Sequence, residues 1–284
     1  MKKLLMWLAL WSSFSTLFAQ KEASISILVT SPAGYATRFQ KQFEGSKLTP
    51  VVIPMIETVI PKDCKEVDLL LKRLNDYDYL AFSSRKAIES FALRLQKDST
   101  DWDKLNNVKC CAIGKDAEYL QEMLHCSNAV QPEEPSPMGI VCKLKEIPNI
   151  SGKSIAVLAP KVEGMTEPDV VPEFICALQK LNMKVTRIPA YITHAVDRST
   201  LVRATELIRN GKVACIAFTS GTEIEVLLNA LENNASLLSH TTIACFGPYT
   251  ANYAKKKGLK VEIVAKDFSS FEGFVNAIQD YFKE

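Results

Sequence analysis

Hydrophobic residues in this chain form short continuous runs, and most runs are followed by a stretch in which they recur every three or four positions. The clearest example is the apolar run 215–218, which ends in the polar turn 219–222 and leads into a helical pattern over 224–231. This order predicts a buried strand, a tight turn and a helix. Open α/β sheets bind ligands at such strand ends, where hydroxyls and the N–H groups of the helix start are available.

The same unit recurs along the chain and predicts an α/β protein. Strands are expected over 26–30, 49–53, 77–82, 108–113, 154–158, 184–188, 215–218, 242–246 and 260–264. Helices are expected over 35–44, 65–75, 85–91, 116–124, 138–145, 172–181, 198–209, 224–231, 249–257 and 270–282, with loops over 127–137 and 159–164. Two of the strands are expected to stop at Pro54 and Pro189. Continuous rather than alternating apolar strands indicate parallel sheets that helices cover on both faces.

The two halves of the chain also match each other at an offset of about 135 residues. The matched pairs are 27–29 with 155–157, 51–54 with 186–189, 81–84 with 217–220, and 112–114 with 245–247. Any two α/β halves share some of this rhythm, but four matches in one order favour two like domains. Such domains would face each other across a cleft lined by their strand-end turns.

Composition narrows the class of protein. A chain of 284 residues with 47% apolar and 23% charged residues is long enough for about two soluble domains. A net charge of +2 gives no basic field for nucleic acid. The eight cysteines form no Cys-x-x-Cys pair and have no zinc-ligand spacing, so we interpret them mainly as small buried hydrophobic residues in a reducing compartment.

The first 22 residues have the character of a leader and are set apart from the fold. Lys2 and Lys3 precede a short apolar run, and a small residue, Ala19, lies near its end, as in a secretory signal peptide. A wrongly assigned start or another kind of targeting leader is the alternative. The run is too short and interrupted for a stable membrane span. Together with the two-domain repeat, the leader also allows a periplasmic-type binding protein.

Several motifs are absent from the sequence. No Gly-x-Gly-x-x-Gly follows a strand, and there is no Gly-x-x-x-x-Gly-Lys-Ser/Thr loop and no Gly-x-Ser-x-Gly elbow. The three histidines share no motif. The sequence therefore predicts no nucleotide site, no metal site and no cofactor, and a ligand would be held by backbone amides, hydroxyls and scattered cations.

The ordered turns of both halves resemble those of the uroporphyrinogen-III synthase family. The resemblance covers about residues 25–282 and is carried by 77–84, 112–114, 189–193, 218–220 and 246–251. Within the family, residues 31–35 and 268–273 are similar to a divergent plant form.

This resemblance implies two α/β domains joined by a two-stranded linker, one formed by 23–54 with 195–284 and the other by 55–194. It implies a hydro-lyase that cyclises the linear tetrapyrrole hydroxymethylbilane to uroporphyrinogen III, inverting the last pyrrole and releasing water, on the pathway to heme and chlorophyll. It further implies a monomer without a cofactor. The plant-like features imply a plastid location, and the cytoplasm is the alternative.

The resemblance also implies roles for particular residues. Tyr191 matches the tyrosine that assists departure of the hydroxyl, although packing at the domain junction is an alternative role. The expected substrate-binding residues are Ser84, Gly114, Thr219, Ser220, Gly247 and Thr250. Ser31, the Asp116-Ala117 pair and Ala159 depart from the family pattern, and Asp116 is expected to repel a substrate carboxylate. These departures leave open a non-catalytic, tetrapyrrole-binding or regulatory relative.

Overall fold

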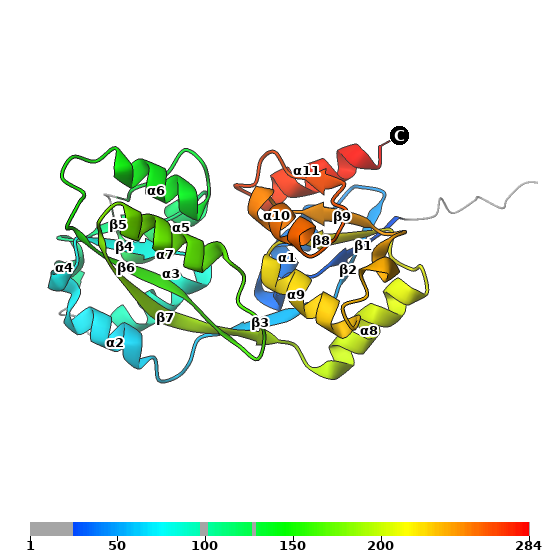
Figure 1. The fold of residues 1–284 in the computed structure, drawn as a ribbon, viewed down its shortest axis with the longest axis horizontal. Coiled ribbons are helices and arrows are strands. Elements are labelled where there is room, and N and C mark those ends of the chain that lie inside the picture. The colour runs from blue at the N-terminus through cyan, green and yellow to red at the C-terminus, as the bar shows by residue number, and fades with distance from the viewer. Residues whose placement is uncertain (1–24, 97–101, 127–128, 284) are drawn as a thin grey trace, which may run out of the picture.

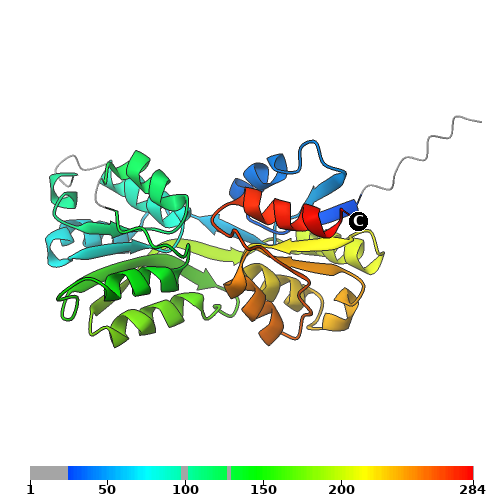
Figure 2. The same ribbon diagram turned by 90° about the horizontal axis from the view of Figure 1, so that it is seen from above.

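The computed structural model describes residues 25–96, 102–126 and 129–283, and the predicted leader 1–22 lies outside these ranges. This part of the chain forms two five-stranded sheets, each flanked by helices, which lie side by side along the long axis of the molecule (Figure 1). The view from above shows helices on both sides of each sheet (Figure 2). The predicted two-domain α/β fold with sheets rich in parallel strands is confirmed.

The first sheet combines the start of the described chain with its C-terminal third. Its strand order is β10-β9-β8-β1-β2, and all neighbours are parallel. The strands are β1 (Ile25–Val29), β2 (Leu48–Val52), β8 (Cys215–Phe218), β9 (Thr242–Cys245) and β10 (Ile263–Val264). The helices around it are α1 (Ala33–Lys41), α8 (Arg198–Arg209), α9 (Gly221–Ala230), α10 (Pro248–Lys256) and α11 (Phe271–Tyr281), with a 3₁₀ turn at Ala235–Leu238.

The second sheet is built from the middle of the chain. Its order is β3-β7-β6-β4-β5, and only β3 among the described strands is antiparallel to its neighbour. The strands are β3 (Ile56–Val59), β4 (Tyr79–Phe82), β5 (Lys109–Cys111), β6 (Ser154–Glu163) and β7 (Lys184–Ala195). Its helices are α2 (Lys65–Lys72), α3 (Arg85–Leu95), α4 (Trp102–Leu105), α5 (Asp116–Leu124), α6 (Pro137–Lys145) and α7 (Val170–Lys180), with a 3₁₀ turn at Leu74–Asp76.

Four strands of each half take the same order, β2-β1-β8-β9 in one sheet and β7-β6-β4-β5 in the other. These are the strands paired in the sequence repeat, so the repeat reflects two like sheets. Burial explains their continuous apolar runs. Leu28 packs in the core on one face of its sheet, while Ile27 and Val29 pack in the core on the other. All residues of β4 and β8 are buried.

Two predicted strand ends are wrong. Strand β6 continues past 158 through the predicted loop to Glu163, and β7 passes Pro189 and ends at Ala195. The pairing of β6 with β7 shifts register between Ala159 and Pro160, opposite Pro189, so the missing proline N–H falls at an irregularity of the ladder. The extended end of β7 pairs with β3, a strand that the sequence pattern did not predict.

Strands β3 and β7 run between the two halves and form the two-stranded connection seen below the sheets in Figure 1. The division of the chain at 54/55 and 194/195 stays a prediction. It is supported by the sorting of the strands, since every strand of the first sheet lies within 23–54 or 195–284 and β3 to β7 lie within 55–195.

Candidate active site

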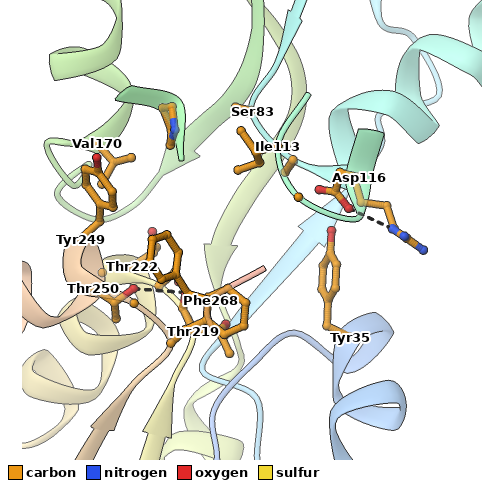
Figure 3. Close-up of a pocket in the computed structure, with 18 of the residues that line it drawn as sticks. Tyr35, Ser83, Ile113, Asp116, Val170, Thr219, Thr222, Tyr249, Thr250 and Phe268 are labelled. Carbon is orange, nitrogen blue, oxygen red and sulfur yellow. Dashed lines mark hydrogen bonds and ion pairs between the residues drawn. The ribbon is translucent and has the colours of Figure 1, made fainter. Parts of the chain in front are cut away.

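A cavity of about 550 Å³ lies between the two halves of the molecule, and turns at the carboxyl ends of strands from both sheets line it (Figure 3). All seven residues that the sequence singled out line this cavity: Ser84, Gly114, Tyr191, Thr219, Ser220, Gly247 and Thr250. Their contact with a substrate stays a prediction.

Eight helices begin at this cavity. The residues that cap or open them and line the cavity are Pro32 (α1), Ser84 (α3), Lys115 (α5), Ser136 (α6), Val170 (α7), Ser220 (α9), Gly247 (α10) and Ser270 (α11). Each helix start presents N–H groups and the positive end of the helix dipole. Their convergence favours negative charge at the helix starts, although the carboxyl side chains of Asp116, Glu167, Glu223 and Glu272 also line the cavity.

Tyr191 and Ser84 form a connected pair in the second half. Ser84 caps α3 by accepting a hydrogen bond from the N–H of Ala87, and its own hydroxyl donates to Tyr191 Oη at 2.9 Å. The Tyr191 side chain is buried, and burial raises the pKa of its phenol while the hydrogen bond from Ser84 opposes the rise. Because Tyr191 Oη accepts from Ser84, its own proton is available to a ligand in the cavity.

Thr219 and Ser220 are arranged differently from the expectation that their hydroxyls bind the ligand. Ser220 Oγ donates to Glu223 Oε1 at 3.0 Å, and Thr219 Oγ1 donates to the same oxygen. Glu223 Oε2 accepts from the Thr219 N–H at 2.8 Å and from Thr30 Oγ1 at 2.6 Å. Glu223 is fully buried, and burial raises the pKa of its carboxyl. The donors left for a ligand at this turn are the backbone N–H groups at the start of α9 and the hydroxyl of Thr222, which lines the cavity.

Gly114, Gly247 and Thr250 form close contacts around the cavity. Gly114 has a φ of +51°, and a Cβ there would lie 3.2 Å from the carbonyl oxygen of Ser269 on the opposite wall. A Cβ on Gly247 would meet the Phe268 side chain at 3.0 Å. Thr250 Oγ1 donates to the carbonyl of Thr219 at 3.3 Å, which connects two turns of the same wall.

Sequence reasoning left out several charged and phenolic groups of the cavity. Arg85 Nε donates to Asp116 Oδ1 at 3.2 Å, so the negative charge of Asp116 is paired rather than facing the ligand alone. Burial raises the pKa of the Asp116 carboxyl, and Arg85 opposes the rise. Tyr35, from the opposite wall, points toward Asp116 (Figure 3). Arg38 also lines the cavity, with its guanidinium 5.3 Å from the centre of the Tyr35 ring.

The other departures from the family pattern lie away from the cavity surface. Ser31 and Ala159 are completely buried, and neither is among the residues that line the cavity in the described chain. The positively charged residues that line the cavity are Arg38, Arg85 and Lys115.

Two side chains of α10 form polar contacts with the other half of the molecule at the cavity. Tyr249, on α10, donates through Oη to Glu134 Oε1 at 2.9 Å and lies 3.2 Å from Ser136 Oγ. Lys256, two turns further along α10, pairs with Asp169 at 2.9 Å. These contacts hold the walls together on the α10 side of the cavity.

Two helix starts share a signal that the sequence analysis did not use. Ser136 and Ser270 cap α6 and α11 by accepting from the N–H groups of Gly139 and Gly273, three residues on. The spacing of 134 residues between them extends the internal repeat. Glu223 also stands three residues after Ser220, which is the spacing of a capping box and could have identified it.

Within the described ranges no group of three or more His, Cys, Asp or Glu side chains could hold a metal ion. Among the same residues, no helix combines the length and apolarity that a membrane crossing requires.

A cavity between two α/β domains, lined by helix starts, hydroxyls and arginines, defines a two-domain protein built to hold an anionic ligand. The sequence model of a family described as "Uroporphyrinogen-III synthase HemD" matches residues 37–274. The chain belongs to this family, whose members are lyases of tetrapyrrole biosynthesis.

Individual relatives agree with the family match. The chain is similar to the uroporphyrinogen-III synthase of Synechococcus elongatus, with 22% identity over 268 residues, 91% of this chain and 96% of that protein. It is 24% identical over 259 residues to the synthase of Chlorobaculum parvum, covering 91% of this chain and 99% of that protein. Both relatives are bacterial, and the predicted affinity to a plant form stays a prediction.

The fold is also that of solved synthases. A mutant uroporphyrinogen III synthase from Thermus thermophilus aligns with a TM-score of 0.63 at 16% identity, covering 90% of this chain and 99% of that chain. The wild-type Thermus enzyme in another crystal form aligns with a TM-score of 0.50 at 15% identity, covering 91% and 98%.

Proposed function

We propose that this protein cyclises hydroxymethylbilane to uroporphyrinogen III in the cavity between its two domains, with inversion of the last pyrrole ring and release of water. The observation that carries the proposal is the convergence of eight helix starts on one cavity that also holds the Ser84–Tyr191 pair. The family match supplies the reaction.

The cavity suits a substrate that carries carboxylates on all sides. Each helix start can donate backbone N–H groups to a carboxylate, and such charge-assisted hydrogen bonds contribute roughly 1.5–3 kcal/mol each. The start of α9 is well suited, because Glu223 occupies the hydroxyls of Thr219 and Ser220 and leaves the backbone donors to the substrate. Gly247 precedes α10 and has no side chain that could accept hydrogen bonds from the backbone N–H groups at the start of this helix.

We assign to Tyr191 the role of assisting the leaving hydroxyl. Its phenol keeps its proton at neutral pH, since burial raises its pKa, and Ser84 orients the oxygen by donating to it. Transfer of the phenolic proton lets the hydroxyl leave as water. The proton released from the substrate on completion of the ring then returns to the Tyr191 oxygen, so the enzyme is regenerated.

The rest of the catalysis is orientation. Hydroxymethylbilane is a flexible chain, and its two ends must meet in one geometry for the last pyrrole to invert. Two walls that grip carboxylates from opposite sides hold the ends together and convert ring closure into a pre-oriented intramolecular step.

The assay of the reaction tests this proposal. The purified protein is mixed with hydroxymethylbilane, and the type III and type I isomers of the product are separated after oxidation. We expect the type III isomer to dominate. If only the spontaneous type I isomer forms while the protein still binds the substrate, the protein is a non-catalytic tetrapyrrole-binding relative. If it neither turns over nor binds, the cavity serves another ligand.

We further propose that the protein acts as a monomer in a plastid. The plastid rests on the plant-like segments at 31–35 and 268–273. Microscopy of the full chain carrying a C-terminal fluorescent protein tests the compartment, with cytoplasm or export as the opposing outcomes. Light scattering of the purified protein tests the monomer.

A further inference from the structure

Two thiols lie in contact beside the cavity wall, and neither takes part in the proposed reaction. Cys110 Sγ and Cys126 Sγ are 3.2 Å apart. Cys110 belongs to β5, where it is buried, and Cys126 follows α5 and is half-buried. A disulfide has an S–S length of about 2.05 Å, so a movement of only about 1 Å would join the two sulfur atoms.

We propose that Cys110 and Cys126 are a reversible modification site that a small-molecule disulfide of the glutathione class oxidises to an intramolecular disulfide. The two residues are separated by one strand end, one turn and one helix, so the bond would close a short loop over residues 110–126. This loop contains Ile113, Gly114, Lys115 and Asp116, which line the cavity. The bond would therefore fix both ends of the segment that supplies one wall of the active site.

Disulfide exchange takes two successive attacks by thiolates. Exposure and hydrogen bonding indicate that Cys126 makes the first. Cys126 is the more accessible sulfur, and the Cys110 S–H group can donate to the Cys126 thiolate, which lowers the pKa of Cys126. The hydrogen bond to Cys126 and burial raise the pKa of Cys110. Cys126 is the nucleophile, because the thiolate and not the thiol attacks disulfides.

The exchange balances without another reagent. The Cys126 thiolate attacks one sulfur of the small disulfide, forms a mixed disulfide and releases one small thiol. Cys110 then loses its proton, attacks the Cys126 sulfur and releases the second small thiol. Two protein thiols are oxidised, and one small disulfide is reduced to two thiols.

The neighbouring cysteines provide internal controls. Cys111 lies next to Cys110 but is completely buried, and burial raises the pKa of its thiol to about 12. Cys142 and Cys176 are exposed single thiols that a small disulfide can reach. Oxidation should give them mixed disulfides with the small thiol, which reports that the oxidant has acted on the sample.

Peptide mapping tests the proposal. The full chain is treated with oxidised glutathione, free thiols are alkylated, and the protein is cleaved after lysine and arginine. Cys110 is released with Cys111 on peptide 110–115, and Cys126 with Cys142 on peptide 116–143. We expect these two peptides to be linked, and the link to persist in Cys142→Ser and in Cys111→Ala. The link should be absent in Cys126→Ala. Reduction of the wild type should break the link and regenerate both free thiols.

Two results would overturn the proposal. One is glutathione on Cys142 and Cys176 with no link between the two peptides. The other is a link that survives in Cys126→Ala. Since Cys126 is half-buried at the end of a helix, its replacement by alanine is compatible with folding, and circular dichroism of the variant checks this. None of these outcomes depends on turnover of hydroxymethylbilane.

Discussion

At the scale of single residues, the two walls of the cavity use their hydroxyls in opposite ways. Ser84 donates to Tyr191 and so orients its phenolic oxygen. Ser220 and Thr219 instead donate to the buried Glu223. Glu223 is thus a positioning residue, because both of its carboxylate oxygens accept hydrogen bonds that hold the α9 turn. Its carboxylate accepts from three side chains and one backbone N–H.

Replacement of Glu223 by glutamine tests this role. Glutamine has an NH₂ group in place of one carboxylate oxygen, and this group cannot accept the hydrogen bonds that the oxygen accepts. A buried donor left without a partner costs about 1–3 kcal/mol. We expect Glu223→Gln to lower the free energy of unfolding in urea by this amount and to raise KM more than it lowers kcat. Unchanged stability and unchanged KM would contradict the role. Glu206, an exposed residue of α8 away from the cavity, provides the control Glu206→Gln.

At the scale of elements, helix starts fix the geometry of both walls. Ser136 and Ser270 cap α6 and α11, and the glycines three residues on allow the preceding loops to pass close to the helices. A Cβ on Gly273 would lie 2.3 Å from the carbonyl oxygen of Asp267, and one on Gly139 would lie 2.1 Å from that of Glu134. Both obstacles are backbone atoms, which cannot rotate away.

We therefore expect Gly273→Ala to destabilise the protein by about 1–3 kcal/mol, the usual cost of overpacking. Gly34→Ala is the control, because no atom lies within 4 Å of a Cβ at Gly34 and the residue is in helix α1. Alanine favours a helix over glycine, so this variant should be neutral or slightly more stable. Urea unfolding of both variants makes the comparison, and equal losses at the two sites would contradict the steric account.

The start of α8 gives a prediction on pH. Asp197 caps this helix, and hydrogen bonds from Ser199 and from the Thr200 backbone and hydroxyl lower its pKa to about 2. An aspartate in an unfolded chain has a pKa of about 3.9. The folded state therefore gains stability from Asp197 above that value, and this gain is lost as the pH falls toward 2. Asp197→Ala should have a lower urea midpoint than the wild type at pH 7.

The difference between Asp197→Ala and the wild type should shrink between pH 4 and pH 2.5, where Asp197 of the unfolded chain binds a proton before the folded carboxyl does. Parallel urea titrations at pH 7, 4 and 3 measure it. A difference that is constant across this range would show that the cap does not act through its charge.

Much of this element structure follows from the sequence, since α5, α8 and β8 begin and end where the apolar pattern places them. The missed strand β3 has only four residues, and its pairing with β7 is made across the linker. Pro189 was a misleading stop signal, because the irregularity in the ladder with β6 that accommodates it is a property of two strands together. Arg85 was missed as a site residue for a similar reason, since its partner Asp116 comes from another turn that it meets only in the fold. Glu223 was missed although its capping-box spacing from Ser220 is present in the sequence.

At the scale of the whole molecule, contacts across the cavity join the two domains. Tyr249 donates to Glu134 on the opposite domain, and the carbonyl of Ser269 lies close to Gly114. We expect the substrate to enter before the walls come together, so that closure is part of binding.

Loss of the Tyr249 hydroxyl should weaken closure. One hydrogen bond of this kind contributes about 0.5–1.5 kcal/mol, so we expect Tyr249→Phe to raise KM by about 2- to 10-fold with a smaller effect on stability. Small-angle scattering should show a larger radius of gyration for this variant without substrate. Tyr281→Phe, at an exposed tyrosine of α11, is the control and should match the wild type. An unchanged KM in Tyr249→Phe would mean that the contact does not govern closure.

The isomer composition of the product tests the proposed reaction and the role of Tyr191 most directly. It is measured for the wild type and for Tyr191→Phe, each mixed with hydroxymethylbilane at equal enzyme concentration. General acid catalysis contributes about 10²–10⁴-fold, so the wild type should give the type III isomer and Tyr191→Phe should give mainly spontaneous type I isomer, with kcat reduced by at least about 10²-fold. Equal type III yields and rates from both proteins would contradict the role of Tyr191. Type I product alone from the wild type would contradict the proposed function.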